Sequence, residues 1–166
     1  VSLKNSSKLN EISKFISESI SRLDKYENAD SKMIEIPVVY GSEYGPDLER
    51  VSEHTGLSSS KIIKHHSQKE YLVYFIGFSI GFPYFGGMDN VIATPRLESP
   101  RKIVPEGSIG IAGNQTGIYP LSSPGGWNLI GRTPLKIFNF DNPEESLISM
   151  GNTVKFISIT DKEFQN

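Results

Sequence analysis

The chain has 166 residues, of which 37% are hydrophobic and 22% charged, a composition typical of a globular protein with one core and at most a small appendage. Its formal net charge of −2 argues against a nucleic-acid-binding protein, which usually presents a basic face. There is no cysteine, no apolar run of membrane-span length and no signal-peptide pattern, so we expect a cytoplasmic protein without disulfides, thiolate zinc sites or membrane segments.

The first predicted element is an amphipathic helix over residues 9–24. Its apolar residues recur at spacings of three and four and therefore share one face: Leu9, Ile12, Ile16, Ile20 and Leu23. A lone helix with such a face needs a surface to pack on, either the main body of the protein or a partner segment that the chain lacks. Because the chain opens at Val1 without a methionine, we expect a fragment or a trimmed form of a longer protein.

A strand and two short helices come next. Residues 33–40 are rich in β-forming side chains and predict a strand. Two short helices are predicted over 47–55 and 59–67, with Gly56 after the first and Ser58 capping the second. The continuous apolar run over 71–76 predicts a strand that is buried on both faces.

Residues 77–134 hold 11 of the 15 glycines and 7 of the 10 prolines, interleaved with aromatic and branched side chains. Glycine and proline oppose helix formation, so this region predicts short strands joined by tight, shaped loops. Two further strands are predicted over 135–140 and 153–160. The whole chain is therefore expected to be mostly β, with a short helical insert.

The helix pair has the spacing of a helix-turn-helix, so DNA recognition by its second helix is one interpretation. That helix offers Lys61 and Lys64 but no arginine for contact with guanine, and the chain is slightly acidic. A helical hairpin packed over a barrel end is the interpretation that we favour. The histidines of this region, His54, His65 and His66, lack the spacing of a metal-binding helix, so no metal site is predicted.

The glycine-rich segment 110–117 lacks the lysine of a phosphate-binding loop and is followed by Tyr119 and Pro120, which end any helix. It predicts a hairpin whose tip uses positive φ angles at Gly113, Asn114 and Gly117. Gln115 and Thr116 would then be held rigidly, as a candidate clamp for a polar ligand.

Three arginines in the loops are candidates for binding an anion. Arg96 and Arg101 lie next to prolines that stiffen their loops, and a solvated loop charge remains an equally good interpretation for both. Arg132 follows Gly125, Gly126 and Trp127, where the glycines let the backbone approach a carboxylate or phosphate while the tryptophan packs in the core. No nucleophile, histidine and acid are placed together, so the chain is expected to supply at most part of a catalytic site.

Five long segments, in this order, resemble a known family: Gly77–Asp89, Ala93–Arg96, Val104–Gly113, Gln115–Pro120 and Ser123–Pro134. Glu35–Gly41 and Gly45–Leu48 match as well, so the resemblance covers roughly residues 33–160. The family is the B subunit of bacterial ATP-dependent 5-oxoprolinase, also called allophanate hydrolase subunit 1, and it includes the sensor-kinase inhibitor KipI. The chain departs from the family pattern at Ile80, usually proline, and at Asn114, usually glycine.

The resemblance implies a cyclophilin-like β-barrel over residues 31–166, preceded over residues 1–30 by the tail and last helix of an N-terminal α/β domain. It implies ATP-dependent opening of 5-oxo-L-proline to L-glutamate together with the A and C subunits of 5-oxoprolinase, with ATP bound by the assembled complex. The alternative implied by KipI-like members is a protein-binding module that blocks autophosphorylation of a sensor histidine kinase. We expect the ligand- or partner-binding side chains to gather on one face of the barrel: Phe82, Tyr84, Arg96, Arg101, Gln115, Thr116, Tyr119, Trp127 and Arg132.

Overall fold

The computed structural model describes residues 12–15, 17–18, 32–77 and 79–165. The chain divides into two units, residues 1–31 and residues 32–166. In the first unit, residues 12–15 and 17–18 are helical, and the remainder of the helix predicted over 9–24 lies outside the described residues. The assignment of residues 1–30 to an N-terminal α/β domain also falls largely on residues outside this description and stays a prediction.

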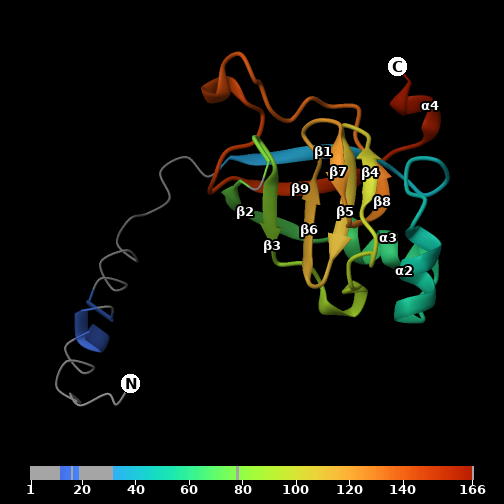
Figure 1. The fold of residues 1–166 in the computed structure, drawn as a ribbon, viewed down its shortest axis with the longest axis horizontal. Coiled ribbons are helices and arrows are strands. Elements are labelled where there is room, and N and C mark those ends of the chain that lie inside the picture. The colour runs from blue at the N-terminus through green and yellow to red at the C-terminus, as the bar shows by residue number, and fades with distance from the viewer. Residues whose placement is uncertain (1–11, 16, 19–31, 78, 166) are drawn as a thin grey trace. The chain divides into compact units, whose positions relative to one another are not determined.

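The second unit is a closed β-barrel with a separate two-stranded ribbon, in which the barrel order is β1-β8-β5-β6-β3-β2-β9 and the ribbon pairs β4 with β7 (Figure 1). The barrel strands are β1 (Met33–Tyr40), β2 (Glu70–Ile76), β3 (Pro83–Gly86), β5 (Ser108–Ala112), β6 (Gln115–Ile118), β8 (Asn128–Arg132) and β9 (Thr153–Ser158). The ribbon strands are β4 (Arg101–Val104) and β7 (Ser123–Gly125). The helical elements are α2 (Leu48–Thr55), α3 (Ser59–Ser67), α4 (Asp161–Phe164) and the 3-10 turns η1 (Asn90–Ile92) and η2 (Pro143–Glu145). The predicted mostly β barrel with a short helical insert is confirmed.

Alternate residues of the strands fill the interior of the barrel. β1 buries Ile34, Ile36 and Val38, and β9 buries Val154 and Phe156. Because successive side chains of a strand point to opposite faces, this alternation places one apolar set inside and leaves the other set outside. Each such buried side chain stabilises the fold by about 1.5–3 kcal/mol relative to exposure.

The helix pair packs on the barrel. α2 ends at Gly56, which has a φ of 70°, and the Ser58 side chain accepts a hydrogen bond from the Lys61 N–H to start α3, so both predicted boundaries are confirmed. α3 turns the buried side chains of Ile62 and His66 inward and contacts β9, as the helical-hairpin interpretation predicted.

Two strand predictions were wrong. β2 is not buried on both faces, because Leu72, Tyr74 and Phe75 are exposed on its outer side and its register shifts between Val73 and Phe75. Residues 135–140 form no strand. The apolar residues of this segment serve instead to hold a connection against the barrel, since Ile137 is buried in the core. The connection turns where the Asn139 side chain accepts hydrogen bonds from two backbone N–H groups that follow it.

Candidate functional site: an aromatic groove

A second apolar cluster lies on the outer face of the barrel, apart from the core. Its buried members are Phe82, Val104, Tyr119 and Leu129, with Tyr84 and Trp127 packed against them. The barrel makes room for these rings because the paired residues Gly110 of β5 and Gly117 of β6 carry no side chain on this face. A Cβ atom at Gly117 would lie 2.7 Å from the Phe82 ring, and one at Gly110 would lie 2.9 Å from the Trp127 Cβ.

Three pairs of aromatic rings in this cluster meet edge to face. The Phe82 ring lies 5.2 Å from Tyr119 and 5.4 Å from Trp127, at interplanar angles of 85° and 76°. Tyr84 lies 5.8 Å from Trp127 at 68°. This is the geometry that aromatic quadrupoles favour, and it fixes each ring against its neighbours.

These rings line a cavity of about 590 Å³, which we call the aromatic groove. Its lining consists of Phe82, Tyr84, Pro95, Arg96, Ala112, Gly113, Gln115, Tyr119, Gly125, Gly126 and Trp127. The groove therefore combines an apolar aromatic floor with a guanidinium, a carboxamide and backbone exposed at glycines. Ligand pockets usually have this composition, mostly apolar with a few polar groups that fix orientation.

The segment that carries Arg96 is held in place on both sides. Thr94 exchanges two backbone hydrogen bonds with Gly113, of 3.1 and 2.8 Å, and the Leu97 N–H donates to the Gly126 carbonyl at 2.7 Å. Between them, the buried Asn128 side chain donates to the Pro95 carbonyl at 3.0 Å. The backbone of Arg96 is thus fixed at the edge of the groove before any ligand binds.

The two tyrosines of the groove are neutral hydrogen-bonding groups at physiological pH. Burial raises the pKa of Tyr119, while a hydrogen bond with the Trp127 backbone and the charges of Arg101 and Arg96 oppose this shift. Burial also raises the pKa of Tyr84. Both phenols therefore keep their protons and can donate as well as accept.

Six of the nine predicted site residues line the aromatic groove: Phe82, Tyr84, Arg96, Gln115, Tyr119 and Trp127. Thr116 does not, because alternate residues of β6 face opposite sides and Thr116 points into the barrel, where it is fully buried. The hairpin that brings Gln115 to the groove formed as predicted, but of its three expected positive φ angles only that of Gly113 is present in this described segment.

Arg101 holds the ribbon to the barrel. Its Nη2 donates to Oδ1 of Asp47 at 2.7 Å, and Oδ2 of Asp47 accepts from the Leu129 N–H at 2.7 Å. Asp47 is nearly buried, so the ion pair is largely shielded from water. Arg101 therefore positions β4 beside the groove and is not one of the residues that line it.

Arg132 does not line the aromatic groove, although we expected it to lie on the same face as Arg96 and Gln115. Trp127 precedes the first residue of β8 and Arg132 is the last, so an extended strand places them about 15 Å apart. The Arg132 Nε donates to the Glu106 carbonyl at 2.7 Å, and the side chain lines a different cavity of about 350 Å³. Trp127 and Arg132 are close in sequence, but they lie apart because β8 extends between them.

A buried polar network under the groove was not predicted from the sequence. The Thr116 hydroxyl donates to the Gly110 carbonyl at 3.0 Å, so its oxygen accepts from Nε2–H of His66 at 2.9 Å. The other ring nitrogen, Nδ1, then accepts from the Tyr40 hydroxyl at 2.8 Å. Burial lowers the pKa of His66 to about 3, so the ring is neutral. The sequence offered one signal of this network, because His66 lies on the same face of the short helix α3 as the apolar Ile62.

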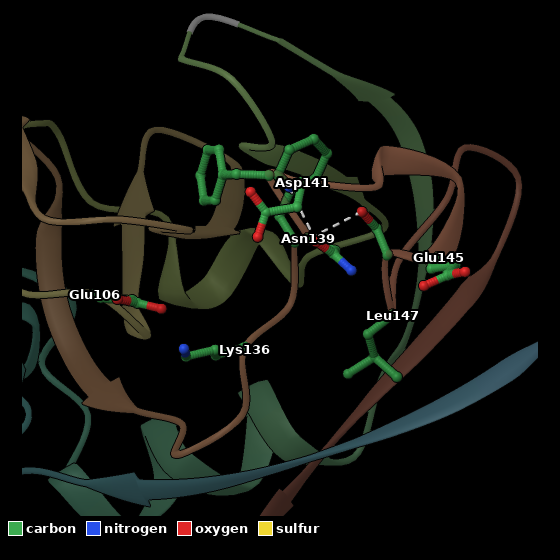
Figure 2. A pocket seen from close by; sticks show the side chains of 9 residues that line it. Glu106, Lys136, Asn139, Asp141, Glu145 and Leu147 are labelled. Atoms are coloured by element: carbon green, nitrogen blue, oxygen red, sulfur yellow. Dashed lines mark hydrogen bonds between the residues drawn. The ribbon is translucent and has the colours of Figure 1, made fainter.

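A further cavity, of about 550 Å³, lies between Glu106 and the connection from β8 to β9. Figure 2 shows Glu106 and Lys136 on one side, Asn139 and Asp141 above, and Glu145 and Leu147 on the other side. Three carboxylates face a single lysine in this lining, which disfavours an anionic ligand. Among the described residues, no group of three or more histidine, aspartate or glutamate side chains is placed to hold a metal ion.

Comparison with known proteins connects this architecture to a family. Residues 1–148 match the family model described as carboxyltransferase domain, subdomain C and D. The chain is 44% identical over 159 residues to the 5-oxoprolinase B subunit of Bacillus subtilis (strain 168), an alignment that covers 96% of this chain and 66% of the relative. It is 50% identical over 128 residues to the 5-oxoprolinase B subunit of Escherichia coli O157:H7, covering 77% and 59%. The chain thus spans about two thirds or less of the length of these relatives.

Solved structures of other proteins are similar to this chain as well. A conserved uncharacterized protein from Pyrococcus horikoshii is 48% identical, with a TM-score of 0.77 over 98% of this chain and 73% of that one. The K. lactis urea amidolyase, at 17% identity and a TM-score of 0.69 over 92% of this chain and 11% of that one, shares the fold. Within the described residues, no helix is long and apolar enough to cross a membrane.

The family match over residues 1–148 and the identities of 44–50% show that the chain belongs to the carboxyltransferase-domain family, subdomains C and D, in which its curated relatives are named as the B subunit of 5-oxoprolinase.

Proposed function

We propose that the chain acts as the B subunit of 5-oxoprolinase, together with the A and C subunits, in the ATP-dependent hydrolysis of 5-oxo-L-proline to L-glutamate. The observation that carries this proposal is the shared name of three curated relatives at 44–50% identity. The family match over residues 1–148 includes every residue of the aromatic groove.

The lining of the groove supports a subunit that recognises a ligand but does not react alone. Its described lining residues include no histidine, aspartate, glutamate, lysine or cysteine, so they offer no general base of ordinary pKa and no activated nucleophile. In the overall reaction, water adds to the ring carbonyl carbon and the ring C–N bond breaks, steps that need such groups. We therefore propose that another subunit supplies them over the open side of the groove.

The residues of the groove do not fit a nucleoside triphosphate. A triphosphate site usually combines several cationic or backbone N–H donors, often at the start of a helix. The groove lining offers one guanidinium, and its glycine-rich segment forms the β5–β6 hairpin instead of opening a helix. We propose that ATP is bound by the assembled complex, and we assign no step on this chain to it.

Reconstitution tests the proposal. The purified chain is combined with the A and C subunits, and L-glutamate release and ATP hydrolysis are measured with 5-oxo-L-proline present or absent. Both rates should depend on this chain. The corresponding protein of Escherichia coli O157:H7, with its own partners, is the positive control. If that control is active while this chain adds nothing to the A and C subunits, the proposal is wrong.

A further inference from the structure

Resting on the proposed function, we infer that the aromatic groove binds 5-oxo-L-proline itself, with the carboxylate on Arg96, the ring amide on Gln115 and the ring against the aromatic floor. Arg96, Gln115 and the aromatic floor would then each bind a different part of the substrate, and each role can be tested by substitution.

Among the described residues, Arg96 is the arginine left available for a ligand. Of the four arginines in the described ranges, Arg50 donates to the Asn128 side chain, Arg101 pairs with Asp47, and Arg132 donates to the Glu106 carbonyl. The exposed Arg96 guanidinium has no hydrogen bond or ion pair with any described residue, although its backbone is fixed on both sides. An unpaired guanidinium on a fixed backbone is suited to a planar carboxylate, which it can bind through two parallel hydrogen bonds.

Gln115 offers the complement of a ring amide. It is the first residue of β6, and its backbone is held in the ladder opposite Ala112, while its half-buried side chain has no hydrogen bond with the described residues. A carboxamide presents one carbonyl acceptor and two N–H donors, which match the N–H and carbonyl of a lactam. The same group has no charge with which to hold an amine.

The charges of the groove favour the substrate over related molecules. At neutral pH, 5-oxo-L-proline is a carboxylate with an uncharged ring nitrogen, whereas L-proline and L-glutamate each carry an ammonium group. The described lining residues include no carboxylate, so an ammonium would lose its hydration there without gaining an ion pair in return. The cavity between Glu106 and the β8–β9 connection has the opposite charge balance and should not take the substrate.

Trp127 is the only tryptophan of the chain and lines the groove, so its fluorescence reports binding at this place. The chain is titrated with 5-oxo-L-proline, with 2-pyrrolidinone, which lacks the carboxylate, and with L-proline, which lacks the ring carbonyl. A saturable change is expected with 5-oxo-L-proline at concentrations where the other two give little. Arg96→Ala should weaken the affinity roughly 10- to 100-fold, the loss expected for a charged hydrogen-bonded contact.

Arg132→Ala is the matched control, because it removes an equal charge outside the groove and should leave the affinity unchanged. Gln115→Ala should reduce the preference for 5-oxo-L-proline over L-proline, and thermal melts of each variant verify that it is folded. No response of Trp127, an equal response to 2-pyrrolidinone, or wild-type affinity of Arg96→Ala would each overturn the inference. The titration uses this chain without the A and C subunits. A negative binding result can therefore be distinguished from a failure of the reconstituted enzyme.

Discussion

Burial of His66 should make the fold sensitive to mild acid, because the ring can take up a proton only when the chain unfolds. Its ring is fully buried, stacks on Phe156 at 4.5 Å, and is held between the Tyr40 and Thr116 hydroxyls. Burial lowers the pKa of His66 from 6.5 to about 3. The native state thus holds the neutral ring, while the unfolded state takes up a proton as the pH falls below about 6.5.

The sign and size of the effect follow from linkage. Because the folded pKa is depressed, the contribution of His66 to stability is complete above the unfolded pKa and is lost progressively as the pH falls toward the folded value. Between pH 7.5 and pH 5, a shift of this size lowers the free energy of unfolding by about 2 kcal/mol. In the folded state the pKa values of Asp89 and Glu163 are lowered from 3.8 and 4.5, so these carboxylates stay mostly ionised in the folded protein across this window.

Urea unfolding at several pH values measures this dependence, with His66→Gln as the reference. Glutamine can accept from Tyr40 and donate to Thr116 but does not titrate, so the difference in pH dependence between the two proteins isolates His66. The wild type should lose about 2 kcal/mol more than the variant between pH 7.5 and pH 5. Parallel curves for the two proteins would refute the reasoning, since they would mean that His66 titrates equally in both states.

Three further predictions concern the groove and its supports. Asp47→Ala leaves the Arg101 guanidinium and the Leu129 N–H without their acceptor, and should lower the unfolding free energy by about 3 kcal/mol in a denaturant titration; a loss below about 1 kcal/mol would contradict a shielded pair. Gly117→Ala places a methyl group against the Phe82 ring and should cost about 1–3 kcal/mol, measured by thermal melting against Gly77→Ala, where the added Cβ meets nothing closer than 3.6 Å. No prolyl isomerase activity is expected, because the fold alone does not supply it, and clear catalysis in a proline-peptide assay would contradict this.

Local chemistry was enough to predict most of the fold. The helix pair was bounded correctly because a glycine ends α2 and a serine caps α3, signals that act within a few residues. The short strands of the glycine- and proline-rich region were expected for the same reason. Exposure of the outer side of β2 was not predictable, because it depends on what covers Leu72 and Tyr74, and an apolar run alone does not specify that.

The composition of the groove was easier to predict than its geometry. Aromatic residues, Arg96 and Gln115 were identified from residue type and stiff loops, and the structure brings them to one cavity. Thr116 and Arg132 were grouped with them because they are close in sequence. Because side chains alternate along β6, Thr116 points into the barrel, and Arg132 lies at the far end of β8 from the groove. The geometry of the strands, and not closeness in sequence, therefore determines which residues line the groove.

Steady-state kinetics of the reconstituted enzyme containing Arg96→Ala show directly whether the groove binds the substrate. If the groove holds the carboxylate of 5-oxo-L-proline, the KM for this substrate should rise roughly 10- to 100-fold with little change in kcat, because a contact away from the reacting carbonyl is made equally in the ground and transition states. Arg132→Ala should show wild-type kinetics. An Arg96→Ala enzyme with an unchanged KM would contradict the assignment of the substrate to the groove.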